Sequence, residues 1–151
     1  MKKAILFAVV AAAMMASAAF AAAPAQKPTG FCKANPDSIG TGAGKLYPNF
    51  GACVKAQADK QEANTTNAAK TCKAERALGA DAFKAKYGTN KNKANAFGKC
   101  VSKIASAKTA QQQTAEVSAA KKCRTAENAA KIGVGKTWRN FGACVKAQTK
   151  S

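Results

Sequence analysis

The chain contains no histidine, and its seven acidic residues are widely spaced. Histidine is the usual general base near neutral pH and the commonest metal ligand. Asp59 and Glu62 are the one close pair of carboxylates, and they lie beside Lys60 in a polar stretch typical of a solvated surface. The residue inventory therefore predicts a protein that is not an enzyme and that binds no cofactor.

The cysteines lack the spacing of a metal or redox site. At least 18 residues separate any two of the six. Structural zinc sites use ligand pairs about two to four residues apart, and thioredoxin-like redox sites use Cys-x-x-Cys. We therefore predict no metal site and no redox motif.

Large apolar residues are scarce, and alanine supplies much of the 47% hydrophobic content. An alanine-rich core buries little area per residue, so we expect covalent staples to carry part of the stability. Acidic residues are also few, and the formal net charge is +18. A charge of this sign attracts polyanions, although the same lysines also keep an alanine-rich protein soluble.

The first 23 residues have the features of a secretory signal peptide. Lys2 and Lys3 precede the apolar run Ala4–Ala16, and small-residue sites follow that predict cleavage after Ala21 or Ala23. We expect a single mature domain, residues 24–151, that is secreted or held in the cell envelope. An uncleaved membrane anchor is the alternative. No second apolar segment follows, so we expect no integral membrane segment in the mature chain.

Three copies of Phe-Gly-x-Cys-Val give the chain a repeated organisation. They lie at residues 50–54, 97–101 and 141–145, and each has one further cysteine upstream, so the units span about 32–54, 72–101 and 123–145. Residues 44–57 and 135–148 are identical at eleven of fourteen positions. An ungapped match of this quality indicates internal duplication. In an exported protein, an even number of cysteines predicts disulfides, at Cys32, Cys53, Cys72, Cys100, Cys123 and Cys144.

The stretches between the repeats favour helix. Residues 50–79 and 96–132 lack proline and are rich in alanine, so we predict two long antiparallel helices, joined near residues 87–90, and a short C-terminal helix from residue 141. Two prolines argue against a helix at residues 24–29. We predict N-caps at Asn49, Asn95 and Asn140. One face of the second helix has near 3-and-4 spacing and is mixed in character; it comprises Phe97, Val101, Ile104, Gln111, Thr114 and Val117.

Helix geometry limits how the cysteines pair. Cys53 and Cys72 are 19 residues apart on one predicted helix, or about 28 Å, whereas a disulfide needs Cα atoms within about 7 Å. We therefore expect each unit to close its own disulfide, as a clasp across a helical hairpin. One alternative stays open, in which Cys53 pairs with Cys123 and Cys32 pairs with Cys144.

The large side chains are expected to cluster at these disulfides. The three groups are Tyr47 with Phe50 and Val54, Phe83 and Tyr87 with Phe97 and Val101, and Trp138 with Phe141 and Val145. Residues 71–103, TCKAERALGADAFKAKYGTNKNKANAFGKCVSK, resemble a cysteine-containing helical repeat of small exported bacterial proteins of unassigned function. The resemblance implies export and a repeated module, and it implies no activity.

The basic loop of the middle unit is the best functional lead in the sequence. Lysines crowd around Tyr87, and we expect them to contact an anionic polymer such as a wall polymer, a nucleic acid or an acidic glycan. Arginine is rare, so specific bidentate recognition is not indicated. A solvated loop with no partner and a cationic membrane-active or antimicrobial protein are the alternatives. The predicted contacts are Lys84, Lys86, Lys91, Lys93, Lys99 and Lys103.

Overall fold

The computed structural model describes residues 24–150, so the predicted leader at residues 1–23 lies outside the described residues. The predicted all-α class is confirmed, because the described part of the chain holds helices and no strand, with only two isolated parallel bridges. In chain order the elements are α1 (Pro28–Ala34), the 3₁₀ turn η1 (Pro36–Ser38), α2 (Phe50–Leu78), α3 (Ala80–Tyr87), α4 (Ala96–Cys123), α5 (Ala126–Ala129) and α6 (Phe141–Gln148).

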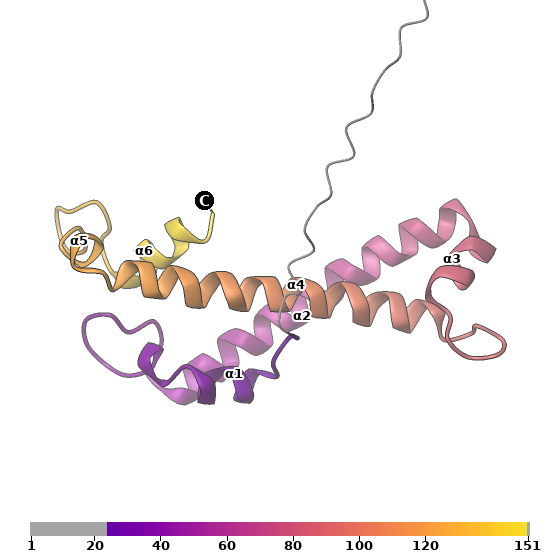
Figure 1. Ribbon diagram of the computed structural model, residues 1–151, viewed down its shortest axis with the longest axis horizontal. Helices are drawn as coiled ribbons and strands as arrows, with labels where there is room; N and C mark the ends of the chain where they lie inside the picture. Colours follow the sequence, from indigo (N-terminus) through magenta and orange to yellow (C-terminus); the bar gives the residue numbers. More distant parts are fainter. Residues whose placement is uncertain (1–23, 151) are drawn as a thin grey trace, which may run out of the picture.

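The two long helices, α2 and α4, cross near their middles (Figure 1). Three alanines in these middle stretches are buried, namely Ala68, Ala105 and Ala110. The distance between packed helix axes depends on the side chains at the contact, so alanines let two helices approach closely. On one side of the crossing lie α1, α5 and α6, and on the other lies α3 (Figure 1).

The mixed face of the second helix is only partly buried in the structure. Gln111 and Thr114 are exposed, and the larger apolar residues of that face are only half-buried. The face of α4 that is buried consists of small and polar residues, namely Ala96, Cys100, Ala105, Thr109, Ala110, Gln113, Glu116, Ala119, Ala120 and Cys123.

Two of the three predicted N-caps are present. Asn49 Oδ1 accepts a hydrogen bond from Ala52 N, and Asn140 Oδ1 accepts one from Ala143 N, both at 2.8 Å. The prediction for Asn95 is wrong, since its side chain bonds backward to Thr89 in the preceding loop. The cap therefore distinguishes the two outer repeats from the middle one.

Two predicted boundaries also differ from the structure. The second long helix ends at Cys123 and not near residue 132, because Thr125 Oγ1 and Asn128 Nδ2 both donate to the carbonyl of Lys122 at 2.9 Å. Such local side-chain bonds offer the backbone an alternative to continued helix. Helix α1 begins at Pro28, inside the stretch expected to be non-helical, because proline is well tolerated in the first helical turn.

The structure contains the three disulfides that close within the units, and not the alternative pairing. They join Cys32 to Cys53, Cys72 to Cys100 and Cys123 to Cys144, with Cα atoms 6.0–6.1 Å apart. All six residues are at most 1% exposed. Each disulfide lies within one of three apolar clusters, so the large side chains gather at the disulfides. Among the residues predicted to belong to these clusters, Phe50 is the exception, since it is 42% exposed.

The duplication of the outer units extends to their loops. Tyr47 N donates to Ser38 O and Gly40 N donates to Tyr47 O. In the third unit, Trp138 N donates to Lys131 O and Gly133 N to Trp138 O. Gly40 and Gly133 have φ of 125° and 144°, a region that favours glycine. The two outer units therefore share a loop geometry as well as a sequence.

Candidate functional site

The predicted basic contacts lie at the α3 end of the molecule. Lys84 and Lys86 belong to α3, Lys91 and Lys93 to the following loop, and Lys99 and Lys103 to the first turns of α4. We call these six residues the lysine tip. All six are exposed.

Two members of the lysine tip already have acidic partners. Lys84 Nζ lies 3.9 Å from Asp81, and Lys86 Nζ lies 2.5 Å from Glu75 Oε1. The hydroxyl of Tyr87 donates to Glu75 Oε2 at 2.9 Å. Hydrogen bonds from Lys86 and then from Tyr87 lower the pKa of Glu75. These two lysines are thus less free to meet an external anion.

The other four members have no acidic partner among the described residues. Lys99 and Lys103 are separated by four positions on α4, so they share one face of the helix. Arg76 adds a cation nearby, and its guanidinium lies 5.4 Å from the ring centroid of Phe97. This end of the molecule therefore presents unpaired positive charge.

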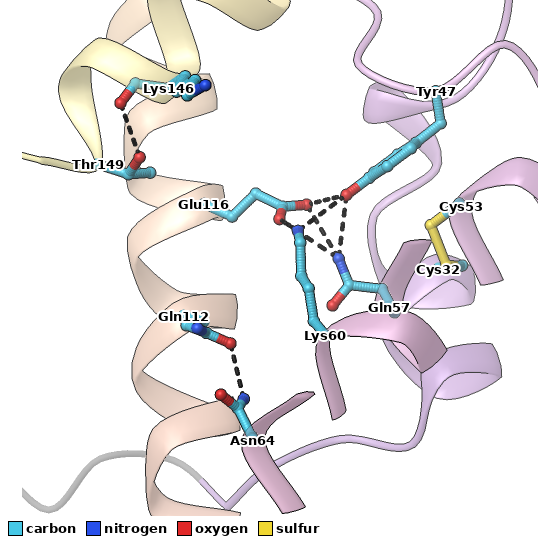
Figure 2. A network of polar contacts seen from close by, with 10 residues as sticks. All are labelled: Cys32, Tyr47, Cys53, Gln57, Lys60, Asn64, Gln112, Glu116, Lys146 and Thr149. Carbon is cyan, nitrogen blue, oxygen red and sulfur yellow. Dashed lines mark hydrogen bonds and ion pairs between the residues drawn. A yellow bond between two sulfur atoms is a disulfide. The ribbon is translucent and has the colours of Figure 1, made fainter. Parts of the chain in front are cut away.

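A second group of charged residues is buried near the opposite end, where the first unit meets α4 (Figure 2). Glu116 on α4 is only 7% exposed. Its Oε1 accepts from the hydroxyl of Tyr47 at 2.6 Å, and Gln57 Nε2 donates to both carboxylate oxygens at 3.1 and 3.3 Å. Lys60 forms an ion pair with Oε2. The buried carboxylate is thus neutralised and surrounded by donors, as burial of a charge requires.

The hydroxyl of Tyr47 is held in its neutral form. Burial is the largest cause that raises the pKa of Tyr47 well above its ordinary value, followed by the hydrogen bond to Glu116 and the charge of that carboxylate. Gln57 also donates to the Tyr47 hydroxyl at 3.0 Å. Each tyrosine of the chain therefore belongs to a Tyr–Glu–Lys triad, one buried at Glu116 and one more exposed at Glu75.

A surface pocket of about 570 Å³ adjoins the buried triad. It lies between α2, α4 and α6, and Figure 2 shows Lys146 and Thr149 on the stretch of chain beside Glu116. Lys108 and Lys146 line it together with Lys60, and apolar side chains of Leu46 and Val145 form part of its wall. The pocket thus combines positive charge with apolar surface.

A larger pocket, of about 880 Å³, lies between the loop of the first unit and the third unit. Arg124 lines it and donates to the carbonyls of Asp37 and Gly44, at 2.9 and 3.1 Å. Its guanidinium also lies 5.3 Å from the ring centroid of Phe141. Because that arginine joins the two units, we regard this pocket as a structural junction.

The sequence did not predict the buried triad. One signal was available, since Glu116 is the only acidic residue of α4. A single carboxylate among many lysines has several cations with which it could form an ion pair. Its actual partners lie 56 to 69 positions earlier in the chain, too far for any local pattern to indicate.

The structure of residues 24–150 also bears on metal binding and on membrane insertion. No group of three or more potential metal-ligating side chains occurs in that range. Within the same range, no helix is long and apolar enough to span a bilayer. Three disulfides indicate an oxidising, extracellular environment.

No family model, no curated protein and no solved structure matches this chain. The resemblance of residues 71–103 to an exported cysteine-containing repeat therefore stays a prediction.

Proposed function

We propose that the protein is an exported, non-enzymatic interaction module that binds anionic polymers through the lysine tip. The unpaired lysines at the α3 end carry this proposal. Lys91, Lys93, Lys99 and Lys103 are exposed and have no acidic partner among the described residues. Long-range attraction between such a patch and a polyanion is strong at low ionic strength and weakens as salt increases.

The distribution of the acidic residues supports this proposal. Five of the seven acids form ion pairs with lysines within the chain. Removal of Lys2 and Lys3 with the leader leaves a net charge of +16 on the mature chain, two less than the whole. Most lysines are therefore left without a carboxylate, and counterions from solution balance their charge.

The scaffold also suits such a role. In this proposal the mature protein is an antiparallel pair of long helices, with disulfide-clasped hairpin units at its ends. Covalent closure at Cys72 and Cys100 holds α3 and the basic loop against the start of α4. A patch that is held in place before binding loses less conformational entropy on binding than a flexible tail does.

Binding should be measured with the oxidised mature protein, with heparin and double-stranded DNA as sulfate and phosphate polyanions. We expect affinity to fall linearly with salt on a double-logarithmic plot. The variant Lys99→Ala/Lys103→Ala should reduce the slope by up to about two. An affinity that does not change with salt would contradict binding by charge.

The matched control is Lys55→Ala/Lys131→Ala. Both of these lysines pair with an acid four positions away, and the variant loses the same formal charge. We expect a smaller loss of affinity than for Lys99→Ala/Lys103→Ala. Equal losses in the two variants would show that net charge, and not the lysine tip, governs binding.

Dye release from anionic vesicles tests the membrane-active alternative. We expect no release, because the large hydrophobic residues that are exposed among the described residues do not gather on one face. Phe50 and Leu78 lie at opposite ends of α2, and Val134 lies in the loop between α5 and α6. Amphipathic membrane-active helices instead gather such residues on one face. Release that grows with anionic lipid content would favour the alternative function.

A further inference from the structure

The pocket beside Glu116 differs from the lysine tip in having both shape and depth. It is formed where α6 of the third unit packs on α4 beside α2, and its volume is about 570 Å³. Glu116 is one of its lining residues, and the buried carboxylate is fixed by Tyr47, Gln57 and Lys60. A site built on such a network is preorganised, since its polar groups already have fixed partners.

The charges that line this pocket do not cancel. Three lysines, Lys60, Lys108 and Lys146, face one carboxylate, that of Glu116. Lys60 pairs with Glu116. Lys108 and Lys146 have no acidic partner among the residues the structure describes, so the pocket retains two positive charges.

Apolar surface lies next to these charges. Leu46 contributes from the loop of the first unit, Ala56 from α2, Ala115 from α4 and Val145 from α6. Small-molecule sites typically combine such apolar walls with a few polar groups that fix orientation. The complementary ligand has an anionic head and a body with little charge.

We propose that this pocket binds a small organic oxyanion, in which one phosphate or carboxylate group meets Lys108 and Lys146 and an apolar or ring-shaped body lies against Leu46 and Val145. The proposal deepens the proposed function, on which it rests, because a charged unit of an anionic polymer has this chemistry. The lysine tip then provides attraction along the polymer, and the pocket holds one of its units.

The test uses phenyl phosphate and benzoate as probes, with inorganic phosphate as the charge without the body and phenol as the body without the charge. Amide chemical shifts of the ¹⁵N-labelled, oxidised mature protein are followed by NMR at each addition. We expect saturable shifts for residues 145–149 and around residues 56 and 115 with one of the two organic anions. The preferred head group distinguishes a phosphate from a carboxylate ligand. Phenol should cause no saturable shift.

The decisive variant is Lys108→Ala/Lys146→Ala, since both residues are exposed and neither forms an ion pair among the described residues. Each exposed charge contact contributes up to about fivefold in affinity, so we expect about tenfold weaker binding of the organic anion. The matched control is Lys121→Ala/Lys122→Ala, which removes the same charge from exposed positions of α4 that do not line the pocket. The control should bind as the unaltered protein does.

Three results would overturn the proposal: no saturable shift with either organic anion, shifts spread over lysines throughout the molecule, or equal weakening in the two double variants. Heparin binding separates this failure from failure of the proposed function. Heparin binding that depends on Lys99 and Lys103, without a pocket response, would overturn only the pocket. A pocket response without salt-dependent heparin binding would overturn the proposed function and leave a small-molecule site.

Discussion

The hydroxyl of Tyr47 lies 2.6 Å from Oε1 of Glu116, although the two residues are 69 positions apart. This contact ties the loop of the first unit to the C-terminal part of α4, where the buried helix residues nearby include Ala119 and Ala120. Tyr87 and Glu75 form the corresponding contact at the other end, at 2.9 Å. Glu75 is more exposed than Glu116. The two pairs offer a matched comparison of the same chemistry in buried and exposed surroundings.

The first prediction concerns this pair of contacts. Tyr47→Phe should lower the free energy of unfolding by about 1–3 kcal/mol, because it removes a buried donor to a charged acceptor. Tyr87→Phe should cost less, because Glu75 is only half-buried and water can replace the lost donor there. Urea unfolding of the oxidised protein measures both. A loss for Tyr87→Phe as large as that for Tyr47→Phe would contradict the structural role of the buried triad.

The second prediction is a loss of stability at alkaline pH. The pKa of Tyr47 is raised in the folded state, mainly by burial, above the value of about 10 for an unfolded tyrosine. A raised pKa stabilises the fold fully below the unfolded value, and this contribution is lost as the pH increases above it. In Tyr87→Phe, which leaves Tyr47 as the only tyrosine, ultraviolet absorbance of tyrosinate should therefore appear above pH 10 and together with unfolding. Titration of Tyr47 near pH 10 while the protein keeps its helicity would contradict this prediction.

The third prediction separates the outer repeats from the middle one. Asn49→Ala and Asn140→Ala each remove a side-chain cap and should cost about 1 kcal/mol. Asn95→Ala removes no cap and instead releases Thr89, so it should loosen the basic loop without fraying α4. Amide hydrogen exchange in the first turn of each helix distinguishes these outcomes. Amide exchange at residues 97–99 that is faster in Asn95→Ala than in the unaltered protein would show that Asn95 does cap the helix.

The disulfide framework and the helices could be predicted from the sequence because both depend on local signals. Helix rise alone excludes a bond between Cys53 and Cys72, and the structure joins each of them to the other cysteine of its own unit. The caps at Asn49 and Asn140 follow from their position directly before Phe-Gly. The sequence did not indicate which face of α4 is buried, because the large side chains mark a mixed face while buried alanines such as Ala105 and Ala110 lie in the middle stretch of the helix.

The two candidate sites differ in the same way, because one depends on residues that are close in the sequence and the other on residues that meet only in the fold. The lysine tip was found because its charges are close together in the sequence. The sequence did not indicate that Lys86 is engaged by Glu75, since that ion pair joins α3 to α2. The pocket beside Glu116 was missed entirely, because Lys60, Lys108 and Lys146 come together only when three helices meet.

The fourth prediction compares two glycines, of which one is closely surrounded by other atoms and the other has open space around it. A Cβ atom at Gly88 would lie 2.6 Å from the carbonyl of Lys84 and 2.5 Å from Cβ of Lys93, so Gly88→Ala must displace the basic loop and should destabilise the protein. A Cβ atom at Gly98 meets nothing within 4 Å, so Gly98→Ala should stabilise α4 by up to about 1 kcal/mol. Thermal unfolding measures whether each substitution lowers or raises the stability. Destabilisation by Gly98→Ala would indicate a close neighbour at that position.

The fifth prediction is that the two ends of the molecule lose order separately. Cys72→Ala/Cys100→Ala removes a disulfide worth about 3 kcal/mol in the chain-entropy model, and the cluster around it depends on Phe83 and Tyr87. We expect α3 and the basic loop to lose protection from hydrogen exchange. The contact between Tyr47 and Glu116 lies on the other side of the crossing and should persist.

The matched variant is Cys123→Ala/Cys144→Ala, which opens the third unit and should release α6 while α3 stays protected. Releasing α6 removes one wall of the pocket beside Glu116, so the response to organic anions should be lost in this variant and retained in Cys72→Ala/Cys100→Ala. Heparin binding should show the opposite pattern, because the lysine tip depends on the middle disulfide. If either double variant unfolded both ends at once, the crossing of α2 and α4 would be a cooperative core, and the disulfides would not stabilise the two ends independently.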